Sequence, residues 1–520
     1  MSAQPGGPGH YWKPTHSPWT VSFAVLLATF IAVLDTSVAN VSLPHIAGNL
    51  SASTDEATWI LTSYLVASAI VLAATGWLSS YFGRKNYLLF SVMLFTVSSA
   101  LCGMAQSLPQ LILARVLQGI GAGGLQPLAQ AIMLESFPVE RRGAAMAAFG
   151  MGIIVAPIVG PTLGGWITDN YSWRWIFYIN VPIGLIGFML QKMYVEDPPY
   201  LARTRHKTID YIGLSLMVLA IGTLQLVLDQ GQEADWFGSR WICWGTALVV
   251  VTMPLFIWWE VRRKDPFIDL RLLKDRNLAV GALLAALMGS VLYGSTALLP
   301  VFMQRLLKYT ALASGLAMTP RGFGSMAAMF LVGKMVSKVN NKAMLVFGFL
   351  GLGLTCIAFA HLDLDIARSN ITVPQIFNGF SMGFIFVPLT VLTMSTMHQH
   401  QINQATGIFN LVRNIGASIG ISIIFTMQTR MAQAHQVFLV SHISSYSQNL
   451  QQWAAHLPLP GKSLYALLYA KVSQQAYMLA FLDVFRLLAL ISFLSIPLVF
   501  LFSRPRQHGQ AKPASEPLEI

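Results

Sequence analysis

The chain has 520 residues, of which 55% are hydrophobic and 10% are charged, and its formal net charge is +12. Soluble domains carry about 25% charged residues, so this composition excludes an ordinary soluble enzyme. Apolar stretches of about 20 residues, the length of a membrane-spanning helix, recur from Trp19 to Phe502. These runs are continuous, whereas transmembrane strands alternate in polarity. We therefore expect an all-α integral membrane protein.

Charges and clusters of Gly, Pro and Asn divide the apolar sequence into fourteen predicted spans. In chain order the predicted spans cover residues 19–43, 57–81, 86–106, 109–133, 142–167, 175–194, 208–229, 240–260, 279–304, 310–334, 342–361, 371–395, 404–428 and 476–502. The predicted domains are a cytoplasmic tail at 1–18, an N-terminal six-helix bundle at 19–195, two inserted helices with a cytoplasmic linker at 196–278, a C-terminal six-helix bundle at 279–503 with an external loop at 428–475, and a cytoplasmic tail at 504–520.

The distribution of basic residues predicts the orientation of these spans. With the N-terminus inside, 21 of the 33 Lys and Arg residues fall on the cytoplasmic side, 8 fall on the opposite side and 4 lie within spans. Cytoplasmic loops of polytopic proteins carry such an excess. We therefore expect both termini in the cytoplasm, and we attribute the basic charge to orientation and not to nucleic-acid binding.

An internal repeat relates the two six-span groups. Three residues after the second span recur at a constant shift of 257, as the pairs Gly76 and Gly333, Ser80 and Ser337, and Lys85 and Lys342. Gln118-Gly119 has a weaker echo in Asn378-Gly379. Internal repeats with a substrate site at their interface are the usual build of secondary transporters.

Five segments resemble motifs of the major facilitator superfamily, namely LDTSVANVSLP at 34–44, GWLSSYFGRK at 76–85, RVLQG at 115–119, APIVGPTLGG at 156–165 and WRWIFYINVPIG at 173–184. In this order, over nearly the whole chain, they resemble its fourteen-helix drug:proton antiporter branch, the EmrB and QacA type. The resemblance implies two six-helix bundles with two inserted helices, no cofactor, and export of amphipathic toxic compounds in exchange for protons across the bacterial cytoplasmic (inner) membrane. Ser80, where the family has Asp, and Ala156, where it often has Gly, depart from the pattern.

Asp35 and Arg115 are the expected proton-coupling residues. A carboxylate near the middle of a span costs about 2.5–3.5 kcal/mol and must face a cavity or a partner. Such a group can take up a proton from one side and release it to the other, while a nearby guanidinium stays charged. The resemblance places the helices of both residues along the cavity. The structural alternatives are an Asp35 that hydrogen-bonds Thr36 or Ser37, and an Arg115 that bonds backbone carbonyls.

Other residues are expected to contact cargo or to pack the helices. The candidates for cargo contacts are the in-span polar residues Asn40, Gln118, Gln375, Asn378, Asn410 and Arg413. Asn410 and Arg413 share a helical face. Gln375 occupies the repeat position of Arg115 at a shift of 260. The candidates for gating and packing are Gly76, Gly83, Arg84, Lys85, Gly160, Pro161, Gly164 and Gly165, the last four packing the fifth span against the other half. Because Ser80 replaces the usual acid, Arg84 and Lys85 need other partners. Asp483 and Arg486 are expected to form a local pair.

Several alternatives remain open from the sequence. We expect neither a disulfide framework nor a metal site from the cysteines, because Cys102, Cys243 and Cys356 are isolated and are interpreted as buried small hydrophobes. We also expect no cofactor. The segment 428–475 either forms extramembrane helices that meet a periplasmic membrane-fusion adaptor and an outer-membrane channel, or is a surface hairpin. The alternative functions are export of an endogenous metabolite or siderophore, a non-transporting sensor, and a membrane enzyme, for which no His and carboxylate cluster stands at a membrane boundary.

Overall fold

The computed structural model describes residues 14–198, 210–263, 265–336, 338–443, 452 and 461–503, and the regular elements in these ranges are helices. The N-terminal half contains α1 (Pro18–Asn49), α2 (Thr54–Phe82), α3 (Arg84–Met104), α4 (Leu108–Gly123), α5 (Leu125–Ser136), α6 (Arg142–Asn170), α7 (Trp175–Tyr178) and α8 (Asn180–Tyr194). The insert contains α9 (Tyr211–Gln230) and α10 (Arg240–Arg262). The C-terminal half contains α11 (Arg276–Arg305), α12 (Ala311–Met318), α13 (Pro320–Met335), α14 (Asn341–Phe359), α15 (Ser369–Met394), α16 (Ile402–Ser441) and α18 (Gly461–Val499). Short 3-10 turns cover Val139–Arg141, Trp236–Gly238, Leu270–Lys274 and Gln399–Gln401.

The predicted spans correspond to these helices. Twelve helices within the described ranges are long and apolar enough to cross a membrane, with α7 and α8 counted as one. The predicted spans 109–133 and 310–334 are each built from two shorter helices, α4 with α5 and α12 with α13. Pro127 and Pro320 stand beside the two breaks, and a proline has no N–H to continue the helical hydrogen-bond ladder. The prediction of an all-α membrane protein with fourteen spans is confirmed.

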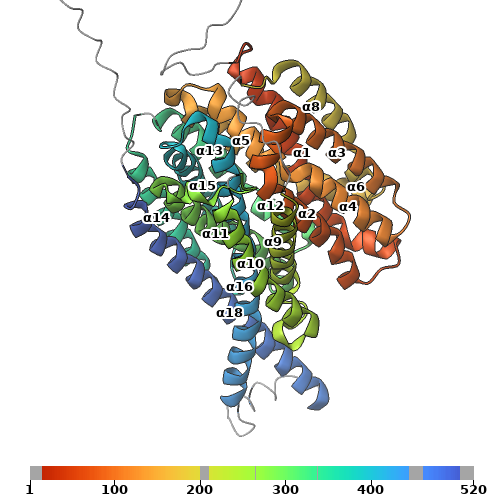
Figure 1. Cartoon of the computed structure of the whole chain (residues 1–520). Coiled ribbons are helices and arrows are strands. Elements are labelled where there is room, and N and C mark those ends of the chain that lie inside the picture. The colour runs from red at the N-terminus through yellow and green to blue at the C-terminus, as the bar shows by residue number, and fades with distance from the viewer. Residues whose placement is uncertain are drawn as a thin grey trace, which may run out of the picture.

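The two halves lie side by side, with the N-terminal half in red to yellow and the C-terminal half in green to blue (Figure 1). Two glycine contacts join them. A Cβ atom at Gly76 of α2 would lie 3.1 Å from the Cα atom of Gln404 in α16, and one at Gly333 of α13 would lie 3.0 Å from the Cβ atom of Ala147 in α6. The shift of 257 relates Gly76 to Gly333 and Ala147 to Gln404. The α2–α16 and α6–α13 seams are therefore related by the same repeat that is visible in the sequence.

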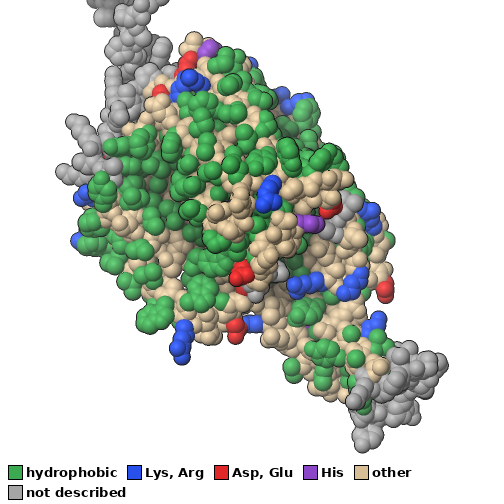
Figure 2. All heavy atoms as spheres, turned by 90° about the vertical axis from the view of Figure 1, so that its right-hand side faces the viewer, with side chains coloured by type: hydrophobic (Ala, Val, Ile, Leu, Met, Phe, Trp, Pro, Cys, Tyr) green, Lys and Arg blue, Asp and Glu red, His purple; other side chains and the backbone are tan. Residues whose placement is uncertain are grey.

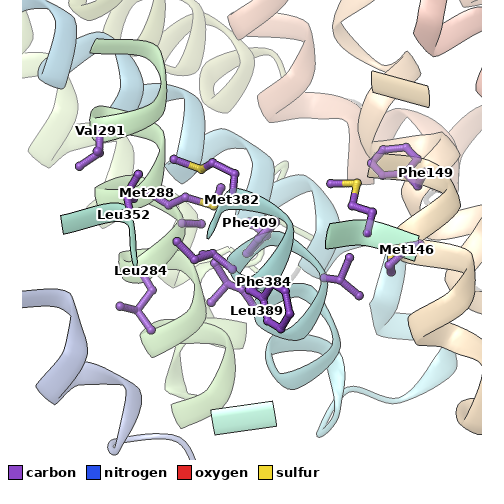
Figure 3. Packing of buried hydrophobic residues seen from close by; sticks show 14 of the residues in the cluster. Met146, Phe149, Leu284, Met288, Val291, Leu352, Met382, Phe384, Leu389 and Phe409 are labelled. Atoms are coloured by element: carbon purple, nitrogen blue, oxygen red, sulfur yellow. The ribbon is translucent and has the colours of Figure 1, made fainter. Parts of the chain in front are cut away.

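Hydrophobic packing continues across the α6 side of this interface. Met146 and Phe149 of α6 face the buried hydrophobic residues of α15 (Figure 3), and the Phe149 and Phe386 rings stack with their centroids 6.3 Å apart. A Cβ atom at Gly143 would lie 1.7 Å from Val336 of α13, so this position has room only for hydrogen. Since α6 begins and α13 ends here, the halves are closely packed at this end of the bundle.

The same end of the bundle holds the first and last described segments of the chain. Thr15 Oγ1 donates a hydrogen bond to Glu196 at 3.0 Å, beyond the end of α8. Lys342 Nζ, at the start of α14, donates to the Phe502 carbonyl oxygen at 2.6 Å. We call this end the terminal face, and it is the end that the basic residues predict to be cytoplasmic.

The inserted helices α9 and α10 cover the α2–α16 seam. Gln225 Nε2 of α9 donates to Ser418 Oγ of α16 at 2.7 Å, and Thr62 Oγ1 of α2 donates to the Asp229 carboxylate of α9. Apolar side chains of α2, α9, α10 and α16 form a shared cluster around Trp77. The insert therefore bonds both halves and does not hang at the edge of one.

The surface outside the interfaces is largely apolar. Figure 2 shows one side of the molecule covered mainly by hydrophobic side chains with few charged ones between them. The α10 helix illustrates this, because Trp244 is 78% exposed. Cys243, which we expected to be buried, is also exposed on this helix. A lipid-facing helix surface accepts small apolar side chains as readily as the protein interior does. The apolar sequence around Cys243 therefore could not predict whether its side chain is buried or faces lipid.

The predicted external loop is largely helical where it is described. The α16 helix has 40 residues and α18 has 39, and at 1.5 Å per residue each is about twice as long as the roughly 30 Å hydrocarbon core. Residues 428–441 belong to α16 and residues 461–475 to α18. Both helices project beyond the bundle at the end opposite the terminal face (Figure 1). The α16 extension contains neither Gly nor Pro to end the helix.

Candidate functional site

A buried ion pair lies inside the N-terminal half. The Asp35 Oδ2 atom of α1 is 2.5 Å from Arg115 Nη1 of α4. Asp35 is 2% exposed and Arg115 is fully buried. The two helices are far apart in sequence, so only tertiary packing brings these charges together. A buried pair is strongly destabilised when one partner is removed, because the remaining charge has no water around it.

Amide side chains complete the hydrogen bonding of this pair. Gln118 Oε1 accepts from Arg115 Nη1 at 2.8 Å, while Gln118 Nε2 donates to Asp35 Oδ1 at 2.9 Å. Asn180 Nδ2, at the start of α8, donates to the same Asp35 oxygen at 2.8 Å and to Ser99 Oγ of α3 at 3.0 Å. The carboxylate thus accepts hydrogen bonds from three side chains on two helices other than its own.

Arg115 has further partners that do not depend on Asp35. Its Nε atom donates to the Ile60 carbonyl oxygen of α2 at 3.1 Å. Its guanidinium carbon lies 4.2 Å from the centre of the Tyr64 ring and 5.8 Å from that of Phe177. Such cation–π contacts contribute about 0.5–2 kcal/mol each. If Asp35 accepted a proton, the guanidinium would still be held by the carbonyl, Gln118 and the two rings. We define Asp35, Arg115, Gln118, Asn180 and Tyr64 as the Asp35 cluster.

Sequence analysis did not assign Asn180 or Tyr64 to a site. Asn180 was visible inside the 173–184 motif, as a polar residue within the predicted span 175–194. Tyr64 carried no such signal, because an aromatic residue in a membrane helix usually packs against lipid or a neighbouring helix. The repeat does single out its position, because the shift of 257 relates Tyr64 to Arg321.

The candidates of the C-terminal half do not gather into an equivalent cluster. Gln375 Nε2 lies 2.9 Å from Met318 Sδ of α12, and Asn378 Nδ2 donates to Thr355 Oγ1 of α14 at 3.1 Å. Asn410 Nδ2 instead crosses to the other half and donates to Gln130 Oε1 of α5 at 2.6 Å.

The remaining two cargo candidates differ in burial. Arg413 is 3% exposed and its side chain runs beside Gly289 of α11. Asn40, five residues after Asp35 on α1, is exposed.

The charged residues after the second span have partners inside the N-terminal half. Arg84 Nη1 lies 2.8 Å from Glu135 Oε2 of α5, and both side chains are 1% exposed. The Lys85 backbone N–H donates to Asp197 Oδ1 at 2.8 Å. Gly83 has φ +85°, a conformation that favours glycine. Ser80 donates to the Gly76 carbonyl oxygen. Glu135, and not a residue of the loop, supplies the acid that Arg84 needs.

The glycines of the fifth predicted span pack differently from our expectation. We expected Gly160, Gly164 and Gly165 to approach the other half, but Cβ atoms at Gly160 and Gly164 would lie 2.5 Å from Ser37 and 2.8 Å from Val38 of α1. Gly165 has only Val41 nearby, at 4.0 Å. The approach to the other half uses the earlier turns of α6, because α13 runs antiparallel to α6 from Gly143 onward. The side chain of Pro161 lies outside the described residues.

Asp483 and Arg486 of α18 form an ion pair at 2.9 Å, and His435 of α16 lies 2.7 Å from the other Asp483 oxygen. This group connects the projecting helices and does not reach the Asp35 cluster.

The first span carries a buried acid and the fourth a buried arginine, and a repeat relates the two halves. These features can be compared with those of known protein families. The family model described as Major Facilitator Superfamily matches residues 25–421. The chain belongs to the major facilitator superfamily. It is a transporter and not an enzyme, so the predicted family is confirmed and the membrane-enzyme alternative is excluded.

Individual relatives show which branch of the superfamily the chain resembles. The "Multidrug export protein EmrB" of Haemophilus influenzae is 37% identical over 489 residues, which cover 93% of this chain and 95% of that protein. The "Fatty acid resistance protein FarB" of Neisseria gonorrhoeae is 36% identical over 94% of this chain and 97% of its own. The crystal structure of the human organic anion transporter MFSD10 (TETRAN) aligns with a TM-score of 0.63 at 12% identity, covering 93% of this chain and all of that one, and this likeness shows the fold alone. The chain is thus a multi-pass major facilitator closely related to the EmrB and FarB proteins.

Proposed function

We propose that this protein exports amphipathic toxic compounds from bacterial cytoplasm in exchange for protons, with Asp35 as the proton carrier. The observation that carries the proposal is the Asp35 cluster, a carboxylate 2.5 Å from an arginine inside a transporter. Intramembrane carboxylates are costly and mark ion pathways in pumps and transporters. The close relation to proteins named for multidrug export and fatty acid resistance supports toxic compounds as cargo.

The contacts suggest how a proton changes the site. A charged Asp35 accepts hydrogen bonds from Arg115, Gln118 and Asn180. Protonation cancels the charge of Asp35 and weakens its attraction to Arg115. The other partners of Arg115 still hold the guanidinium in place. Proton occupancy then changes the coupling between α1 and the helices that carry these residues. In the proposed cycle cargo and proton compete, and rocking of the halves exposes the site to each side in turn.

The packing supports an assignment of the conformation. Under the proposed orientation the terminal face is cytoplasmic and both termini lie inside. The α2–α16 and α6–α13 seams are tightly packed toward this face, at Gly76 and Gly143. We therefore assign this conformation as closed toward the cytoplasm. The inward state requires both seams to separate, which makes Gly76, Gly143 and Gly333 gating positions.

The coupling proposal is tested with Asp35→Asn in inverted membrane vesicles. Asparagine keeps the shape and most hydrogen-bonding capacity but cannot carry the proton, so we expect proton-driven transport to fall to background while cargo binding persists. The matched control is Asp483→Asn, which removes another arginine-paired carboxylate within a helix. Uphill transport that survives in Asp35→Asn would refute the assignment of Asp35.

The projecting ends of α16 and α18 support a proposed partner, a periplasmic membrane-fusion adaptor that continues to an outer-membrane channel. Val437, Phe438 and Tyr465 on these extensions are 72%, 60% and 70% exposed. Photocrosslinking from Phe438 in intact cells should capture an adaptor-sized protein, while crosslinking from Phe347, an exposed residue of α14, should not. Equal yields at the two positions would contradict a specific adaptor surface.

A further inference from the structure

The C-terminal half contains two arginines within the span region that have no acidic partner. Arg413 of α16 is 3% exposed, and its Nε and Nη2 atoms have no hydrogen-bond partner among the described residues. Arg321 of α13 likewise has an unpartnered Nη2 atom. Neither residue takes part in the ion pairs of the described ranges. Charged side chains inside membrane spans are costly and commonly mark substrate or ion pathways.

One face of α11 brings the two arginines together. Arg413 lies against Gly289, where an added Cβ atom would be 3.3 Å from Arg413 Cγ. Arg321 Nη1 donates to Thr296 Oγ1 at 2.6 Å. Gly289, Tyr293 and Thr296 follow one another at spacings of four and three residues, so they share one helical face over about 10 Å. Tyr293 is 40% exposed and stands on this face between the positions that Arg413 and Arg321 contact.

The positions along the helices place this group at mid-membrane depth. Arg413 is about three turns from the start of α16 on the terminal side, and Arg321 begins α13 after the break that divides its span. Substrate sites of secondary transporters lie near the midplane and often at such breaks.

The backbone around Arg413 is rigidly placed. A Cβ atom at Gly416 would lie 2.5 Å from Ala286, and one at Gly420 would lie 2.5 Å from Ser290. Ser290 Oγ also donates to the Gly416 carbonyl oxygen at 2.6 Å. Since α16 cannot shift along α11 without breaking these contacts, the backbone that carries Arg413 is held in place before any ligand arrives, which lowers the entropy cost of binding.

We propose that Arg321, Arg413 and Tyr293 form a binding site for the anionic group of an amphipathic organic anion, a carboxylate in the simplest case. Arginine presents a planar set of donors that matches a carboxylate, and charge-assisted hydrogen bonds are about twice as strong as neutral ones. Tyr293, on the same face of α11, carries a hydroxyl that can donate a further hydrogen bond, and the apolar helix surfaces suit the rest of such a molecule. This inference rests on the proposed export function and defines the preferred charge of its cargo.

The test compares three probes that share a naphthalene body, namely 1-naphthaleneacetate, 1-naphthaleneacetamide and 2-(1-naphthyl)ethylammonium. Binding to the purified full-length protein in lipid nanodiscs should be about tenfold or more tighter for the carboxylate than for the amide, and weakest for the ammonium. Arg413→Gln and Arg321→Gln should each remove most of that preference, because carboxylate binding should fall far more than amide binding. Arg413→Lys, which keeps the charge and loses the planar fork, should lie between.

The control is Arg486→Gln, a surface arginine of the same half that is 63% exposed at its side chain. Equal binding of carboxylate and amide by the native protein would overturn the inference, as would an equal loss of both in the arginine variants. Absence of carboxylate binding at millimolar concentration would also overturn it.

Export is measured separately. If the arginine-dependent preference holds but vesicles move none of the probes, the anion site stands and the export function fails. If export proceeds without a charge preference, the export function stands and the anion site fails.

Discussion

The two halves have the same architecture but opposite electrostatics at mid-membrane. In the N-terminal half Arg115 is paired with Asp35 at 2.5 Å, whereas in the C-terminal half Arg413 has unpartnered donors in the described structure. The repeat makes the difference specific, because the shift of 257 relates Tyr64, which stacks on Arg115, to Arg321. One half thus holds a neutral, hydrogen-bonded group, and the other holds uncompensated positive charge. We infer that the N-terminal half carries the proton and that the C-terminal half binds the charged group of the cargo.

Replacing Arg115 should have the largest effect. Arg115→Gln leaves the buried Asp35 carboxylate unpaired, so we expect the free energy of unfolding to fall by about 3–5 kcal/mol and transport to be lost. Arg115→Lys keeps the charge and should retain partial transport. The pH profile of cargo binding should change in Arg115→Gln, since cargo and proton compete in the proposed cycle and the charge beside the carboxylate is removed. An unchanged pH profile in folded Arg115→Gln protein would reduce Arg115 to a packing role.

Replacing Arg413 should change stability in the opposite direction. Arg413→Met removes a buried charge that has no described partner, so the free energy of unfolding should increase by about 1–3 kcal/mol in ligand-free protein. Thermal unfolding in detergent measures both arginine variants side by side. Destabilisation by Arg413→Met of the size seen in Arg115→Gln would mean that Arg413 is paired after all, and the contrast between the halves would fail.

Removing one amide from the Asp35 cluster should have a smaller effect. Asn180→Ala deletes one hydrogen bond to the Asp35 carboxylate but leaves those from Arg115 and Gln118, so we expect a loss of about 1.5 kcal/mol in unfolding free energy. Asn170→Ala is the matched control, because Asn170 is exposed and bonds only its own helix. Identical losses in both variants would show that Asn180 contributes only to local helix stability.

The smallest effect concerns the ring above Arg115. Tyr64→Phe keeps the aromatic face 4.2 Å from the guanidinium carbon and loses a long hydrogen bond, 3.4 Å, to the Ala32 carbonyl, so stability should change by less than about 0.5 kcal/mol. Tyr64→Leu removes the cation–π contact and should cost about 1–2 kcal/mol. If Phe and Leu behaved alike, the ring would serve only as a spacer.

The fold was largely predictable from the sequence, and the site only in part. Span length and apolar runs are local properties, so the fourteen spans and the repeat could be read directly. Asp35 and Arg115 stood out because charges are rare in spans. Asn180 and Glu135 did not, since their importance depends on which helix they face. The expected approach of Gly160 to the other half was wrong because a small-residue face shows that a helix packs closely without showing against which neighbour.

The α9–α10 insert has a consequence for how the halves separate. It bonds α2 through Asp229 and α16 through Gln225, so its described hydrogen bonds to the two halves lie at the α2–α16 seam and not at the repeat-related α6–α13 seam. The two seams have matching contacts but differ in how easily they open. The α2–α16 seam opens only if the insert detaches from α2 or from α16. Separation of both seams in the inward state therefore carries an additional cost at the α2–α16 seam, where hydrogen bonds of the insert must also break.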